Sequence, residues 1–301
     1  MKRFPLGKTG LMVSQLGIGL AEAGLNMTMA DTKEVSAILN DALDRGVNLI
    51  DAAARYGYSE EMIGATIAHR RTEYIIATKV ESPYTLESIT REIDDSLRKM
   101  RTDYIDIIQL HTCTAGVMMR PVTMEALYKA KKAGKVRFLG YSGDNENAHW
   151  AIESGLFETL QTSFNLVDQS ARYLLLPRAE EKGLGIIVKR AIGNAVWGAK
   201  RDPDPFAPEI AADYTKEYFE RARRLEGMGP LADDPQDRIL LAIGFVLGHP
   251  EVDVAIVGTT SHRHFIRNVE RVESKLPISE KTMDDLHNRF DEIAGFWAQL
   301  G

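Results

Sequence analysis

Three apolar segments of the sequence each end in an ionisable residue, and a tyrosine follows the first of them. Asp51 ends the run VNLID, Lys79 lies near the end of YIIATKV, and His111 ends YIDIIQLH. Tyr56 follows Asp51 in the segment DAAARYGYSEE. Each residue alone has an ordinary structural explanation, as a helix cap, a solvated charge or a packing group. The four together, at the ends of consecutive runs, indicate one shared pocket.

These four side chains suit the transfer of a proton to a carbonyl oxygen. A carbonyl that accepts a hydride becomes an alkoxide and needs a proton at once. A free phenol has a pKa of about 10, and the ammonium group of Lys79 is expected to lower that of Tyr56. Asp51 would keep Lys79 charged, and His111 would hydrogen-bond the substrate oxygen. The pattern therefore predicts carbonyl reduction with Tyr56 as the general acid.

Eight short apolar runs provide the elements that must position these residues. The runs largely lack alternation, as is typical of strands buried on both faces of a parallel sheet. They cover residues 15–20, 47–51, 74–80, 104–111, 136–141, 159–164, 185–189 and 252–257. Helical patterns separate them, including residues 32–45, 86–100, 122–133, 261–274 and 279–300. Eight such units predict an α/β fold: a closed (β/α)8 TIM barrel with a C-terminal helix, forming a single domain over residues 1–301.

Three further features bear on this fold. The spacing of Gly17, Gly19 and Gly24 does not match the phosphate-binding fingerprint of an open doubly wound sheet, which disfavours that alternative. The first 13 residues are expected to form a β-hairpin that plugs the barrel bottom.

Residues 192–237 form a long, proline-containing connection, and we interpret it as a lid or pocket wall with a helix near 211–225.

Composition and charge exclude several classes of function for this protein. The net charge of −6 gives no indication of nucleic-acid binding. The longest apolar run, residues 239–247, is too short to span a bilayer and is expected to be a buried helix. A single cysteine excludes an internal disulfide. We therefore expect a cytoplasmic protein without membrane or nucleic-acid partners, and the oligomeric state stays open.

The segments DAAARYGYSEEMIG, YIIATKV and YIDIIQLH resemble, in order and spacing, the signature segments of the aldo-keto reductase superfamily. The resemblance covers residues 4–269. It implies a barrel that binds NADPH and carries a catalytic tetrad. By that resemblance Tyr56 is the general acid and Lys79 lowers its pKa. Asp51 pairs with Lys79, and His111 orients the substrate.

The resemblance also implies where the nicotinamide end of the cofactor binds. Ser142 in RFLGYSGDN and Gln161 in LQTSFN match residues that hold the carboxamide in the family. The family's Asn after the Ser is Gly143 here, and Asp144 or Asn145 would have to substitute for it.

After the seventh predicted strand, Lys189 and Arg190 stand where the family often has an aromatic residue that stacks on the nicotinamide. Either basic residue is expected to contact the pyrophosphate or an acidic substrate. Stacking on the nicotinamide ring is therefore in doubt.

The segment IVGTTSHRHFIRN resembles the family's segment for the adenosine 2′-phosphate. A helix N-terminus presents free N–H groups to such an anion. The residues of this segment expected to bind the cofactor are Gly258, Thr259, Thr260, Ser261, Arg263, His264, Arg267 and Asn268. Of these, Asn268 matches the family's Asn that contacts the adenine. His264 replaces the family's usual Arg, and Arg267 stands where a Glu is common. Basic side chains favour NADP, with NAD as the alternative.

The family's Trp just after the third strand is missing, so a more polar and roomier pocket is expected. Its predicted lining comprises Glu81, Ser82, Tyr84, Thr112, Cys113, Tyr141 and Trp197. A sugar or hydroxylated aldehyde would suit such a pocket. Two other functions stay open: an NAD-dependent dehydrogenase of a sugar or alcohol, and a slowly turning over regulatory subunit that binds the cofactor. A metal site is not expected, because Lys79 is ill-suited as a ligand and no His-x-His follows the first strand.

Overall fold

The computed structural model describes residues 1–197, 209–233, 235–295 and 297–300. Eight parallel strands close into a barrel in the order β10-β3-β4-β5-β6-β7-β8-β9. Their bounds are β3 Leu16–Gly19, β4 Leu49–Asp51, β5 Ile75–Val80, β6 Ile105–His111, β7 Val136–Ser142, β8 Thr159–Ser163, β9 Gly185–Lys189 and β10 Val254–Gly258. Each predicted apolar run overlaps one of these strands, with β7 and β10 each extending one residue past the predicted end, so the predicted (β/α)8 barrel is confirmed.

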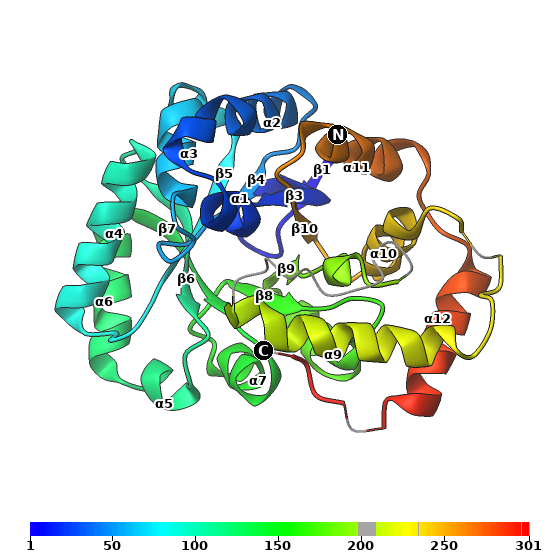
Figure 1. Ribbon diagram of the computed structural model, residues 1–301. Helices are drawn as coiled ribbons and strands as arrows, with labels where there is room; N and C mark the ends of the chain where they lie inside the picture. Colours follow the sequence, from blue (N-terminus) through cyan, green and yellow to red (C-terminus); the bar gives the residue numbers. More distant parts are fainter. Residues whose placement is uncertain (198–208, 234, 296, 301) are drawn as a thin grey trace.

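Helices surround the barrel and connect its strands (Figure 1). Their bounds are α1 Ala21–Asn26, α2 Thr32–Asp44, α3 Ser59–Thr66, α4 Leu86–Met100, α5 Ala115–Met118, α6 Pro121–Lys132, α7 Asn145–Ser154, α8 Leu175–Lys182, α9 Glu209–Glu226, α10 Arg238–Leu247, α11 His262–Ser274 and α12 Glu280–Ile293. The apolar run at 239–247 lies within α10, whose residues are mostly buried, as predicted. No helix of the described residues is both long and apolar enough to cross a membrane.

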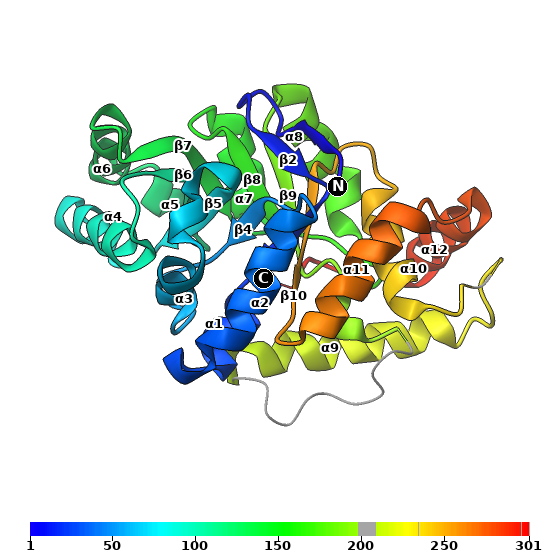
Figure 2. The same ribbon diagram turned by 90° about the horizontal axis from the view of Figure 1, so that it is seen from above.

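An N-terminal hairpin closes one end of the barrel. Its strands, β1 Arg3–Pro5 and β2 Met12–Ser14, pair antiparallel. Leu6, Leu11 and Val13 are buried and pack against apolar side chains of β4, β5, β6, β9 and β10. Figure 2 shows the hairpin at one end of the barrel and α9 at the other. The sequence-based expectation of a plug is therefore confirmed.

The strands place alternate side chains inside the barrel, as their period of two requires. On β6, Ile107 packs with the apolar residues that surround the hairpin, and His111, four residues further along, ends the strand. The polar residues thus come after the apolar ones along the strands. They gather at the carboxyl ends of the strands, where TIM barrels carry their active sites.

The chain end differs from the sequence-based expectation. A helix over 279–300 was predicted, but α12 ends at Ile293. Gly295 has φ +52°, a left-handed conformation that stops helices and favours glycine. Residues 297–300 then run toward α7, where Gln299 and Asn145 exchange hydrogen bonds (Figure 1). The helical spacing of apolar residues past 293 reflects packing of this tail and not a helix.

Candidate active site

A buried ion pair forms the base of the site. Nζ of Lys79, fully buried on β5, donates to Oδ1 of Asp51 at 2.7 Å and to the carbonyl of Ala52 at 2.8 Å. Burial works to lower the pKa of Lys79, but Asp51 and Tyr56 outweigh it and the pKa rises. Lys79 is therefore held as a cation at the strand ends.

Tyr56 lies against this cation in the loop after β4. Nζ of Lys79 is 4.9 Å from the centre of the Tyr56 ring. Burial raises the pKa of Tyr56 more than Lys79 lowers it, so the net direction is upward. The sequence predicted a lowered pKa for Tyr56, because the sequence shows the neighbouring cation but does not show how deeply the phenol is buried. The Tyr56 hydroxyl therefore keeps its proton at neutral pH.

His111 is the fourth member of the cluster. Its ring meets the Tyr56 ring edge to face, with 5.8 Å between centroids. Nδ1 of His111 lies 2.6 Å from Oε1 of Glu81, which follows β5 directly. Burial lowers the pKa of His111, although Glu81 acts in the opposite direction. The structure thus brings all four predicted tetrad residues together and adds a carboxylate partner for the histidine.

Ser142 and Gln161 join this cluster through hydrogen bonds. Nε2 of Gln161 donates to Oδ1 of Asp51 at 2.7 Å, and Oγ of Ser142 donates to Oε1 of Gln161 at 2.7 Å. Both side chains are buried; Ser142 is the last residue of β7 and Gln161 is the middle residue of β8. The two residues predicted from the sequence to hold a carboxamide are therefore adjacent to the proton-transferring groups.

Packing explains why position 143 is a glycine. A Cβ at this position would lie 2.4 Å from the hydroxyl and 2.6 Å from Cζ of Tyr141. Tyr141 is buried and its hydroxyl donates to the carbonyl of Cys113 at 2.8 Å. Its ring therefore cannot move aside without losing that hydrogen bond. An asparagine side chain at 143 is excluded because the Tyr141 phenol occupies its space.

Asp144 and Asn145, the two suggested substitutes, are engaged elsewhere. Asp144 accepts from the Ser163 backbone at 2.7 Å and pairs with Nζ of Lys189 at 2.9 Å. Burial opposes ionisation, yet Lys189 and Arg190 hold the pKa of Asp144 below its usual range. Lys189 is thus an internal partner of Asp144 at the mouth of the barrel.

The C-terminal tail is a part of the site that the sequence did not reveal. Nε2 of Gln299 donates to Oγ1 of Thr162 at 2.9 Å and to the carbonyl of Ser163 at 2.6 Å. Arg190 has φ 57° and donates to Ser163 and to the carbonyl of Leu300. The helical pattern predicted through 300 hid this tail, and Gly295 was the stop signal that could have revealed it.

The start of α11 forms a separate, exposed basic surface. Thr259 accepts from the backbone N–H of Ser261, and Ser261 caps the helix by accepting from His264 N–H at 3.4 Å. Thr260, Arg263, His264 and Arg267 are exposed, and Gly258 is half-buried. Within the described part of the chain, Arg263 and Arg267 form no ion pair. Asn268 is buried and accepts from Arg271 at 2.8 Å.

The remaining residues predicted to line the pocket differ in their burial. Tyr84, Cys113, Tyr141 and Trp197 are buried, whereas Ser82 and Thr112 are exposed and Glu81 is intermediate. Burial raises the pKa of Cys113 to about 12, so its thiol is unreactive at neutral pH. Of the predicted lid, residues 198–208 and 234 lie outside the described residues. The helix expected at 211–225 is α9.

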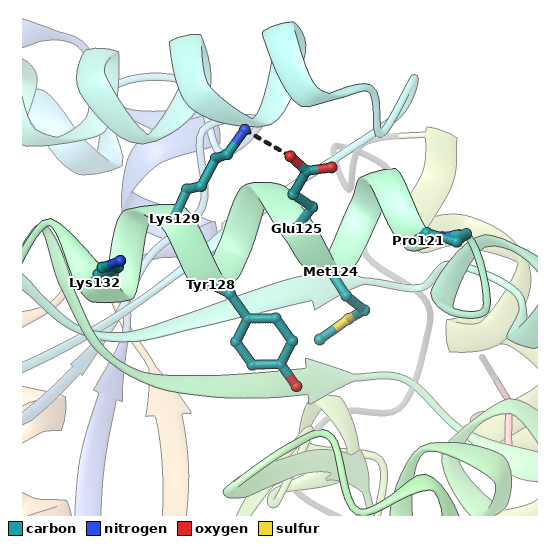
Figure 3. A pocket seen from close by; sticks show the side chains of 6 residues that line it. All are labelled: Pro121, Met124, Glu125, Tyr128, Lys129 and Lys132. Carbon is teal, nitrogen blue, oxygen red and sulfur yellow. Dashed lines mark ion pairs between the residues drawn. The ribbon is translucent and has the colours of Figure 1, made fainter.

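A shallow hollow lies elsewhere, on the outer face of α6. Its lining residues, Pro121, Met124, Glu125, Tyr128, Lys129 and Lys132, all belong to that helix (Figure 3). Glu125 and Lys129 pair across it at 2.6 Å. None of these residues belongs to the tetrad. Among the described residues, no group of acidic, histidine or cysteine side chains is arranged to hold a metal ion.

Comparison with known proteins identifies the family. The model of the aldo/keto reductase family matches residues 15–288. The chain belongs to the aldo/keto reductase family. It is therefore an oxidoreductase.

Curated relatives of this aldo/keto reductase are distant but cover nearly its whole length. L-galactose dehydrogenase of Arabidopsis thaliana is 25% identical, over 93% of this chain and 92% of the relative. NADH-specific methylglyoxal reductase of Escherichia coli is 24% identical, over 94% and 97%.

The solved structures agree with the fold. Aldo-keto reductase AKR11C1 of Bacillus halodurans has a TM-score of 0.77 and 25% identity, covering 96% of each chain. A Klebsiella pneumoniae aldo/keto reductase, solved with NADP and acetate, has a TM-score of 0.73 and 23% identity, over 96% of this chain and 95% of that one.

Proposed function

We propose that this protein reduces an aldehyde or ketone with NADPH and that Tyr56 donates the proton. The observation that carries the proposal is the buried Lys79–Asp51 pair lying against the Tyr56 ring. Burial keeps the phenol protonated, as a general acid must be before the reaction. As charge develops on the substrate oxygen, Lys79 stabilises the phenolate that proton donation leaves behind.

The residues present fit a nicotinamide cofactor, which supplies the hydride when bound. Ser142 and Gln161 offer a hydroxyl and an amide at the inner end of the site. At the outer end, Arg263 and Arg267 are exposed cations beside the N-terminus of α11. Such an end suits a phosphate, and the two cations favour the extra phosphate of NADPH.

The polar rim of the pocket supports a hydroxylated substrate. Glu81 occupies the place after β5, and its Oε1 lies 3.5 Å from Nε of Arg55. A rim with both charges favours sugars and hydroxylated aldehydes over apolar carbonyls. A panel of aldoses, steroids and aromatic aldehydes tests this, and the absence of any preference for aldoses would contradict it.

The opposite direction, oxidation of a sugar or alcohol with NAD, is the second candidate. Relatives named L-galactose dehydrogenase and pyridoxal 4-dehydrogenase favour it. A regulatory protein with slow turnover is less well supported, since all four tetrad side chains are assembled. NADPH fluorescence that changes on binding without turnover of any carbonyl would favour that third function.

Replacing Tyr56 tests the proposal directly. Tyr56→Phe should lower kcat by about 100- to 10,000-fold, because it removes the general acid. The Kd for NADPH, measured by fluorescence titration, should stay within about two-fold, since the ring itself remains. Tyr58→Phe is the matched control: Tyr58 lies two positions on, is 45% exposed, and should be dispensable. Full turnover by Tyr56→Phe would refute Tyr56 as the acid.

A further inference from the structure

Glu81 holds the imidazole of His111 in a fixed orientation. Its Oε1 lies 2.6 Å from Nδ1 of His111. Both partners are anchored by neighbours: the backbone N–H of Glu81 donates to Oε2 of Glu92 at 2.9 Å, and Tyr84 donates to the carbonyl of His111 at 2.6 Å. The pairing is therefore built into the end of β5 and the end of β6.

This pairing determines which ring nitrogen carries the proton. A neutral imidazole has one N–H donor and one bare acceptor nitrogen, and an ionised carboxylate can only accept. Arg55 forms an ion pair with the same Glu81 oxygen, with its Nε at 3.5 Å. The proton of His111 consequently lies on Nδ1, and Nε2 has a free lone pair.

The surroundings keep the ring neutral. Burial lowers the pKa of His111, and the cations Lys79 on β5 and Lys189 on β9 lower it further, against the effect of Glu81. Tyr56, the remaining titratable group in contact with the ring, keeps its proton. Of these two contacting side chains, Tyr56 therefore offers a donor, its hydroxyl, and His111 offers an acceptor, Nε2.

We propose that Glu81 is a positioning residue for substrate specificity: by fixing the Nδ1–H form of His111, it makes Nε2 an acceptor for a substrate hydroxyl next to the reacting carbonyl. This inference rests on the proposed function. Tyr56 donates to the carbonyl oxygen while the neighbouring hydroxyl donates to Nε2. A simple aldehyde leaves Nε2 without a partner, and a buried polar group left unpaired is penalised. The substrate class is thus 2-hydroxy carbonyl compounds.

Two aldehydes that differ by one hydroxyl test the inference in turnover. The intact protein should favour 2-hydroxypropanal over propanal in kcat/KM by about 10-fold or more. In Glu81→Leu the ring can place its proton on Nε2, so the preference should fall to about two-fold or less. Glu81→Gln, which keeps the size and polarity of the side chain, should show an intermediate preference. Hydration of the aldehydes is common to all variants, so changes in the ratio report the protein alone.

Glu61→Leu is the matched control. Glu61 on α3 has a side chain 32% exposed, against 26% for Glu81, and it pairs with Lys99 away from the tetrad. This variant should keep the full preference for the hydroxylated aldehyde. An unchanged preference in both Glu81 variants would overturn the inference.

Nitrogen-15 NMR of the imidazole groups tests the same inference without cofactor or turnover. The His111 resonances, assigned by their loss in His111→Gln, should show Nδ1–H and a bare Nε2 at neutral pH. Glu81→Leu should shift the ring toward Nε2–H. A protonated Nε2 in the intact protein would overturn the inference. If the protein reduces neither aldehyde, the proposed function fails, and the NMR result still decides the role of Glu81.

Discussion

Arg263 and Arg267 lie exposed at the start of α11 without an ion-pair partner among the described residues, which makes them ready to bind a phosphate. Replacing Arg267 with Glu should raise the Kd for NADPH by about 10- to 100-fold, because a charge-assisted contact contributes about 1.5–3 kcal/mol. The Kd for NADH, which lacks the 2′-phosphate, should change by less than about three-fold. Fluorescence titration of both cofactors provides the measurement.

Arg91→Glu controls for the change in net charge. Arg91 is exposed on α4, in another part of the helical ring (Figure 1). Its replacement makes the same charge change without touching α11. Equal weakening of NADPH and NADH binding in Arg267→Glu would show that Arg267 does not recognise the extra phosphate.

At the level of single residues, the four side chains that the sequence singled out do lie together, because three of them end apolar runs that form neighbouring strands and Tyr56 follows the first of these runs. Their catalytic roles stay a prediction. The sequence did not predict the partner of His111, since nothing in the spacing of Glu81 shows where its carboxylate points. It predicted the wrong net pKa direction for Tyr56. Burial depends on the whole barrel mouth, including segments far away in the chain.

Two histidines link the helices α10 and α12. Nδ1 of His249, just after α10, lies 2.8 Å from the carbonyl oxygen of Phe245. Because a carbonyl oxygen can only accept, Nδ1 carries a proton and donates it to this bond. Nε2 of His249 lies 3.0 Å from Nε2 of His287 on α12. Only one of these two facing nitrogens can carry a proton, and the pair is stable when both rings are neutral.

Acid should therefore weaken the attachment of α12. Burial, with help from Arg172, lowers the pKa of His287 to about 4. The unfolded chain, with a histidine pKa near 6.5, binds more protons between about pH 4 and 6.5. Stability from this pair is present above about pH 6.5 and is lost as the pH falls toward 4. In His287→Gln this loss should shrink by about 1 kcal/mol, a figure discounted for the partial exposure of the ring.

Urea unfolding at several pH values measures this effect, and His262→Gln is the control. His262 lies on the surface, 3.2 Å from Asp41, and faces no second histidine. Burial also raises the pKa of Asp168 and Asp253 to about 6 each, which acts in the opposite direction over part of the range. The comparison with the intact protein at each pH cancels that contribution. Identical pH profiles for His287→Gln and the intact protein would contradict the prediction.

At the level of elements, the eight strands could be predicted because strands buried on both faces are apolar without interruption. The end of the last helix could not, because the tail after Gly295 keeps apolar residues at helical spacing while it packs on the barrel mouth. Its structure is set by Gln299 and Asn145, residues 154 positions apart that exchange three hydrogen bonds. Contacts of that range leave no local pattern in the sequence.

Across the whole molecule, stability and chemistry lie at opposite ends of the barrel. The hairpin is joined to the residue just before β10, because the N–H of Gly7 donates to Oδ2 of Asp253 at 3.1 Å. Gly7 has φ +48°, and a Cβ there would lie 2.3 Å from the Gly185 backbone, so the turn fits tightly against β9. The tetrad lies at the other end, beyond the apolar interior. A change at the plug should therefore leave the site intact.

Leu6→Ala tests this separation. Leu6 is fully buried in the plug, and its truncation should lower the free energy of unfolding by about 2–5 kcal/mol through lost burial and a cavity. At a temperature where the variant is folded, kcat should stay within about two-fold, because no tetrad residue contacts the plug. Phe4→Ala, on the same hairpin but 41% exposed, should cost less than about 0.5 kcal/mol. A large loss of kcat in folded Leu6→Ala would show instead that the plug holds the strand ends in register, so that the two ends of the barrel act as one unit.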